Sequence, residues 1–157
     1  MSRKLDVLIR RALEFLYKND SYLISHSPTK AEEDNHKNHA CERAIMFRFA
    51  HYMQMLMYMD VFFSKYSLDC EYNRNIYYVK ALPTLENGVY PDIIIHERGS
   101  NRNNYAVIEI KTYWNPDQSF DRERIKLFMD PDGEYKYING VLIMIGKSRE
   151  EAVVEFI

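Results

Sequence analysis

The chain has little of what marks several common protein classes. It contains two cysteines, Cys41 and Cys70, in 157 residues, which are too few for a disulfide framework, and we expect both to be reduced and buried. Its first residues carry no long apolar stretch of the kind found in a secretory signal. The most apolar segment, residues 44–63, is interrupted by polar and charged side chains, which argues against a bilayer span. The expected location is therefore the cytoplasm, with no membrane partner.

Common catalytic signatures and a strong positive charge are also missing. The chain has neither a glycine-rich phosphate loop nor a nucleophile elbow. Its formal net charge is −2, whereas a protein that held nucleic acid by bulk attraction would be basic. A nucleic-acid substrate would therefore require a local basic patch, a bound cation or a partner.

The hydrophobic pattern predicts helices and strands that form one α/β domain over residues 1–157. Apolar residues at helical spacing indicate helices over residues 3–18 and from residues 37–40 to about 63, and a third helix from Asn115-Pro116 to about Met129. Apolar runs indicate strands over residues 66–74, 91–97, 105–112 and 140–145. Residues 76–82 and 152–157 are expected to form further short extended pieces. This order predicts a central mixed β-sheet flanked by helices.

Three ionisable residues lie in the most apolar strands. Asp92 precedes Ile93-Ile94-Ile95, and Glu109 and Lys111 follow Ala106-Val107-Ile108. Alternate residues of a strand share a face, so Glu109 and Lys111 point the same way. If the intervening turn is centred near residues 100–101, Asp92 and Glu109 are direct cross-strand neighbours, with Cβ atoms roughly 5 Å apart.

A divalent cation would resolve the conflict between two such close carboxylates. Without one, their repulsion would push one carboxyl towards protonation. Carboxylate oxygens favour Mg²⁺ or Mn²⁺, and Lys111 could orient a bound water or neutralise developing negative charge. The alternative is that Glu109 and Lys111 form an ordinary exposed face of an edge strand. The apolar character of both faces of these strands favours a central position instead.

Glu42 is a further candidate, at the start of the second predicted helix. It follows the helical spacing of Met46, Phe49, Met53 and Leu56, so it lies in register with the core-facing stripe. It could reach the metal through water, or it could interact favourably with the helix N-terminus. Both interpretations remain open on the sequence alone.

Asp92, Glu109-Ile110-Lys111 and the helical Glu42 resemble the PD-(D/E)-x-K nuclease superfamily. Residues 69–74 and 121–127 look like motifs of small, uncharacterised prokaryotic members, and the likeness covers about residues 20–145. The resemblance implies a restriction-endonuclease-like core and a metal-dependent nuclease. It implies that Asp92, Glu109 and the Ile110 backbone carbonyl bind the metal, that Lys111 is catalytic, and that Glu42 assists.

Weaker candidates for nucleic-acid contact lie outside this set. Tyr72, Asn73 and Arg74, with nearby Lys80, could contact phosphates and bases, or they could form a polar strand end. Lys126 on the third helix could face the site or lie on a solvated face. The stripe of methionine and tyrosine over residues 46–59 is most simply core, but it could also serve a homodimer.

Two functions follow from these expectations. The first is an endonuclease that hydrolyses phosphodiester bonds with Mg²⁺ or Mn²⁺, and DNA is the expected substrate. The alternative is an inactive module on a nuclease fold that binds nucleic acid or a protein, or that belongs to a larger complex. The net charge of −2 favours the alternative slightly, and the complete set of acidic and lysine residues argues against it.

Overall fold

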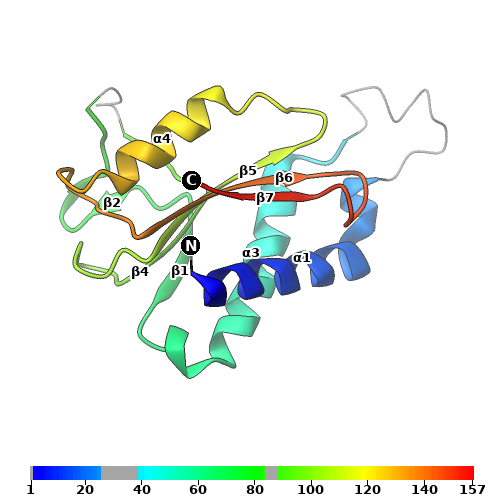
Figure 1. Ribbon diagram of the computed structural model, residues 1–157, viewed down its shortest axis with the longest axis horizontal. Helices are drawn as coiled ribbons and strands as arrows, with labels where there is room; N and C mark the ends of the chain where they lie inside the picture. Colours follow the sequence, from blue (N-terminus) through cyan, green and yellow to red (C-terminus); the bar gives the residue numbers. More distant parts are fainter. Residues whose placement is uncertain (1, 26–38, 84–87) are drawn as a thin grey trace.

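The computed structural model describes residues 2–25, 39–83 and 88–157. In these residues the chain forms α-helices, one short 3-10 helix and two β-sheets (Figure 1). The helical elements are α1 (Arg3–Ile24), α3 (Glu42–Tyr58), η2 (Val61–Phe63) and α4 (Ser119–Met129). The strands are β1 (Ser67–Cys70), β2 (Arg74–Asn75), β3 (Tyr78–Val79), β4 (Ile93–His96), β5 (Ala106–Thr112), β6 (Asn139–Ile145) and β7 (Val153–Phe156).

The main sheet is mixed and has five strands in the order β1-β4-β5-β6-β7. Strands β5 and β6 are parallel and are joined through α4, whereas the other neighbours are antiparallel. Helices α1 and α3 lie on one side of this sheet and α4 on the other (Figure 1). The predicted α/β class, with a mixed sheet between helices, is therefore confirmed.

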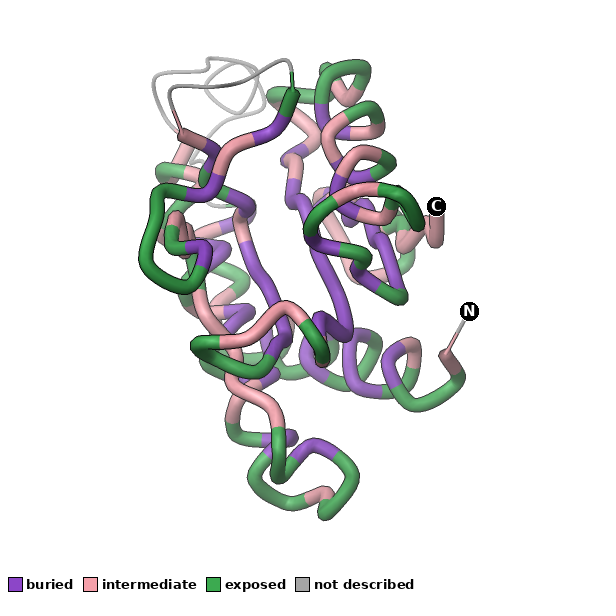
Figure 2. Tube along the Cα trace, turned by 90° about the vertical axis from the view of Figure 1, so that its left-hand side faces the viewer, coloured by how far each residue is buried: buried purple, intermediate pink, exposed green. Residues whose placement is uncertain are grey.

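The two faces of the sheet bury separate hydrophobic clusters. Ile93 and Ile95 of β4 pack with α1 and α3, whereas Ile94 of the same strand packs with Ile125 and Phe128 of α4. Every residue of β4 is buried, and buried residues line the central strands (Figure 2). The expectation that β4 and β5 are central rather than edge strands is confirmed, because each has a strand on both sides.

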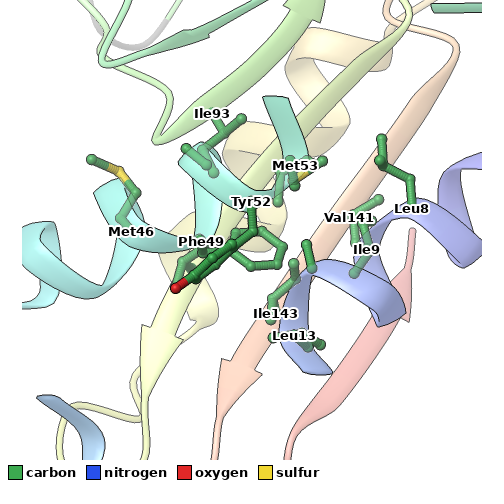
Figure 3. Close-up of a cluster of buried hydrophobic side chains, with 14 of the residues drawn as sticks. Leu8, Ile9, Leu13, Met46, Phe49, Tyr52, Met53, Ile93, Val141 and Ile143 are labelled. Carbon is green, nitrogen blue, oxygen red and sulfur yellow. The ribbon is translucent and has the colours of Figure 1, made fainter. Parts of the chain in front are cut away.

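Helix α3 fits the larger cluster because its apolar stripe has helical spacing. Met46, Phe49 and Met53 are buried, and Phe49 and Met53 lie among side chains of β4, β6 and α1 (Figure 3). Burial of a large aliphatic or aromatic side chain contributes about 1.5–3 kcal/mol. This stripe therefore anchors α3 and places its first residue, Glu42, at the edge of the sheet.

A buried lysine lies in the cluster under α4. The side chain of Lys80 is 2% exposed, and its Nζ lies 5.0–5.8 Å from the ring centroids of Tyr72, Phe128, Tyr135 and Tyr137. It donates a 3.2 Å hydrogen bond to the Tyr137 hydroxyl. Burial lowers the pKa of Lys80 to about 8. The suggestion that Lys80 contacts phosphates is therefore wrong.

Several predicted helix ends differ from the structure. Helix α1 does not end near residue 18 but continues to Ile24 after a non-helical Asp20. The Asp20 carboxylate accepts hydrogen bonds from Arg48 and from Tyr52 of α3, and Ile24 is buried, so tertiary contacts sustain the helix past its polar break. Helix α3 spans 42–58 rather than 37–63, and residues 37 and 38 lie outside the described part of the chain.

Other local predictions also require correction. The strand predicted over 66–74 stops at Cys70, because Glu71 takes a positive φ of 46° and the chain turns into the β2–β3 hairpin. Helix α4 begins at Ser119 and not near Asn115, and the Asp117 carboxylate accepts a hydrogen bond from the Ser119 amide. Cys41 and Cys70 are free, as expected, but exposed rather than buried.

Membrane-spanning character is not found in α1, α3 or α4. Within the described ranges, no helix combines the length and the apolar character needed to cross a bilayer.

Candidate active site

The β4–β5 hairpin brings two carboxylates together. Ile93 pairs with Ile108, Ile94 with Val107 and Ile95 with Ala106. This is the predicted register, and its continuation by one residue puts Asp92 opposite Glu109, on the face that α4 covers. Asp92 lies just before β4, where its Oδ2 accepts a 2.8 Å hydrogen bond from the Ile110 amide.

Glu109 is fully buried, at 0% exposure. Its Oε2 accepts a hydrogen bond from the Arg124 guanidinium of α4. Burial, with the nearby charge of Asp92, raises the pKa of Glu109 well above its usual range, although Arg124 opposes the shift. Among the residues that the structure describes, Oε1 of Glu109 has no hydrogen-bond partner.

Burial also disfavours the charge of Asp92. It raises the pKa of Asp92, against the hydrogen bond from Ile110 and the charges of Arg124 and Lys111. The close carboxylate pair is therefore costly when both members are ionised, as the sequence suggested. A shared proton or a cation between them would remove this cost.

Lys111 lies on the same face of β5 as Glu109, but its Nζ is paired with Asp121 of α4 at 3.2 Å. Burial would lower its pKa, yet Asp121 and Glu42 prevail and raise the pKa of Lys111 above its usual value. Lys111 is therefore a cation at neutral pH. It can stabilise negative charge but cannot accept a proton.

Glu42 stands in the first turn of α3, as predicted, and its side chain reaches the end of β5. Its Oε2 accepts a 3.2 Å hydrogen bond from the Thr112 hydroxyl. Burial raises the pKa of Glu42, while the charge of Lys111 lowers it. Glu42 is thus electrostatically coupled to Lys111, and it also lies at the N-terminus of α3, so both interpretations of this residue stay open.

These groups border one cavity of about 320 Å³. Its walls come from α3, the β1 end, the segment before β4, β5 and α4. The lining residues are Glu42, Arg43, Met46, Glu71, Tyr90, Asp92, Lys111, Phe120, Asp121 and Arg124. The structure therefore brings Glu42, Asp92 and Lys111 to one polar cavity. Glu109 does not line this cavity, but it is paired with Arg124, which does.

The donor set can be compared with what a divalent cation requires. In the described ranges, no three His, Cys, Asp or Glu side chains are grouped closely enough to hold a metal together. Mg²⁺, however, is commonly bound by one or two carboxylates and keeps several waters. The pair Asp92 and Glu109, with the unpaired Oε1 of Glu109, fits such a cation, and the Ile110 carbonyl remains a predicted ligand.

The weaker candidates are not part of this cavity. Tyr72 packs against the His96 ring at 4.9 Å, and the Asn73 carbonyl accepts a hydrogen bond from the Lys80 amide. Arg74 and Lys126 are exposed, and neither lines the cavity. Their predicted contact with nucleic acid stays a prediction.

Two cavity residues on α4, Asp121 and Arg124, were not predicted as site residues. Asp121 is 3% exposed and binds both Arg124, at 3.0 Å, and Lys111. A signal was present, because Asp121, Ile125 and Phe128 share the buried face of α4, and a carboxylate on such a face requires a cation. Arg124 stands three residues after Asp121, where side chains on a helix meet.

Comparison with known proteins gives no relative. No family model, no curated protein and no solved structure matches this chain significantly.

Proposed function

We propose that this protein is a metal-dependent nuclease of the PD-(D/E)-x-K superfamily, with a restriction-endonuclease-like core and DNA as its substrate. One observation carries the proposal: Asp92, the cross-strand neighbour of the buried Glu109, lines a polar cavity that Glu42 and Lys111 also line. The mixed five-stranded sheet with helices on both faces is compatible with the superfamily.

In this proposal each side chain has a separate role. Asp92 and Glu109 would hold Mg²⁺ or Mn²⁺, and such a cation would supply an activated water and polarise a phosphoryl oxygen. Asp92 is already oriented by the Ile110 amide. Glu42 would assist from the first turn of α3, and Lys111, held by Asp121, would stabilise negative charge on the phosphate.

A cleavage assay with matched lysine variants tests the proposal. Single- and double-stranded DNA and RNA are incubated with Mg²⁺, Mn²⁺ or EDTA and wild type, Lys111→Met or Lys18→Met. We expect cleavage that requires a divalent cation and that falls by about 10²-fold or more in Lys111→Met. Lys18→Met removes the same charge from an exposed position on α1, outside the cavity, and should cleave like wild type.

The same assay can contradict the proposal in two ways. Cleavage that persists in EDTA would remove the metal from the mechanism. Equal cleavage by wild type and a folded Lys111→Met would remove the lysine. Asp92→Asn serves as a further check, because its amide oxygen can still accept from Ile110 while the ligand charge is lost.

A second candidate is a binding module on a nuclease fold that does not cut. The Arg124–Glu109 ion pair favours it, since a protein cation already balances one of the two expected ligands. Mn²⁺ titration of the wild-type protein separates the two functions. A specific site supports the nuclease, and its absence together with no cleavage supports the binding module.

A further inference from the structure

Arg124 contacts Oε2 of Glu109, the carboxylate whose other oxygen, Oε1, is proposed to bind the metal. Its guanidinium contacts the Glu109 carboxylate and, at 3.0 Å, the Asp121 carboxylate. The Arg124 side chain is 16% exposed and that of Glu109 is 0% exposed, so this ion pair lies largely away from water. The guanidinium also lies 5.6 Å from the ring centroid of Phe120.

The pairing is nevertheless incomplete. In the part of the chain that the structure describes, both Oε1 of Glu109 and Nε of Arg124 are buried without a hydrogen-bond partner. Each unpaired buried polar group costs about 1–3 kcal/mol. A purely structural arginine–glutamate pair usually takes the two-pronged arrangement that satisfies both groups. The geometry here leaves one carboxylate oxygen open beside Asp92.

The charges around the site explain why a cation is held there. Five carboxylates lie in or beside the cavity, Glu42, Glu71, Asp92, Glu109 and Asp121, and three cations, Arg43, Lys111 and Arg124, line it. Arg43 is paired with Glu71 and Lys111 with Asp121, so Arg124 is the cation that faces Glu109. Arginine suits this role because it stays charged and loses little hydration on burial.

We propose that Arg124 is the internal counter-cation of Glu109 and that it competes with a divalent cation for this carboxylate. The divalent cation itself rests on the proposed function. When Glu109 binds the metal, Arg124 gives up its contact with Glu109 and keeps the one with Asp121. Arg124 thereby stabilises the metal-free protein and weakens metal binding. A structural brace would act in the opposite sense, because its loss would damage the site.

Mn²⁺ binding to the full chain distinguishes competitor from brace. Calorimetric titration compares wild type, Arg124→Met and Arg122→Met. Arg122 is the matched control, because it lies on the same helix as Arg124 and pairs with Glu155 of β7, outside the cavity. Loss of one positive charge beside the metal should tighten Mn²⁺ binding by about tenfold or more in Arg124→Met. Arg122→Met should bind like wild type, because an exposed charge at a distance is screened.

Thermal unfolding supplies a second readout that needs no cleavage. Arg124→Met should melt below wild type in EDTA, because Glu109 loses its counter-charge. Saturating Mn²⁺ should raise its melting temperature more than it raises that of wild type. If Arg124→Met does not fold, Arg124→Gln keeps a hydrogen-bond donor but removes the charge, and it should bind Mn²⁺ more tightly than wild type.

The outcomes separate this inference from the function on which it rests. Equal or weaker Mn²⁺ binding by the folded Arg124 variants would overturn the competition and leave the nuclease proposal intact. Mn²⁺ binding by neither wild type nor variants would overturn both. Tighter Mn²⁺ binding by the folded Arg124 variant, with Arg122→Met unchanged from wild type, would establish the competition.

Discussion

At the scale of single residues, the Lys80 amine has a measurable effect on stability. Burial lowers its pKa to about 8, against about 10.4 for a lysine in an unfolded chain. Between these values the unfolded state binds more protons than the folded state. The free energy of unfolding should therefore rise with pH, by on the order of 2 kcal/mol between about pH 8 and pH 10. Urea denaturation of wild type and Lys80→Met over this range measures it.

Lys80→Met should lack this rise, because methionine fills the aromatic site without a titrating group. Asp69 and Glu134 favour the charged amine and reduce the effect. Tyr137 lowers the free energy of unfolding as the pH rises above about 10, which is the opposite direction. Burial raises its pKa above the value of about 10 for an unfolded chain. Parallel pH dependences in wild type and variant would show that Lys80 is not responsible.

Individual residues also show how far the sequence leads. The pairing of Asp92 with Glu109 could be predicted, because alternation and turn position determine a hairpin register locally. The burial of Lys80 could not be predicted, because the four rings around it come from separate segments and no local pattern indicates them. Arg124 was missed for the same reason: its partner Glu109 is supplied by the strand before the helix.

At the scale of elements, the close packing of α4 on β6 fixes Asp121 and Arg124. A Cβ atom on Gly140 of β6 would lie 2.3 Å from both Ile125 Cγ2 and Met129 Sδ. Gly140→Ala should therefore move α4 and cost about 1–3 kcal/mol. It should also weaken metal binding, although residue 140 is not in the cavity lining. Urea denaturation and Mn²⁺ titration measure the two effects.

A double variant tests the cause. Ile125→Ala makes room for the added methyl group, so Gly140→Ala should cost less in that background than alone. Additive losses would show that contact with Ile125 is not the origin.

The order and type of most elements followed from hydrophobic periodicity, whereas their ends did not. Helix α1 extends past Asp20 because Arg48 and Tyr52 of α3 bind that carboxylate. The strand predicted over 66–74 breaks at Glu71, whose amide bonds to the Asp92 carbonyl. Both ends depend on residues far away in sequence, which a local pattern does not contain.

At the scale of the whole molecule, the charge distribution bears on the proposed DNA substrate. The net charge is −2, and the cavity is lined by four carboxylates, Glu42, Glu71, Asp92 and Asp121, against three cations, Arg43, Lys111 and Arg124, so the proposed function requires a bound cation to attract a phosphate. We expect weak binding of labelled DNA in EDTA. In Ca²⁺, which is used here in place of Mg²⁺, binding should be stronger than in EDTA by about tenfold or more. Fluorescence anisotropy measures both, and tight binding in EDTA would point to a basic surface elsewhere.

Asp92 also joins two strands that are not neighbours in the sheet. Its carbonyl accepts a 3.1 Å hydrogen bond from the Glu71 amide after β1, and its carboxylate accepts one from the Ile110 amide of β5. Any change in the charge or ligation of this side chain alters the shielding of the Ile110 proton directly. The nuclear magnetic resonance signal of one backbone amide is thus a native sensor of the site, and it needs neither substrate nor turnover.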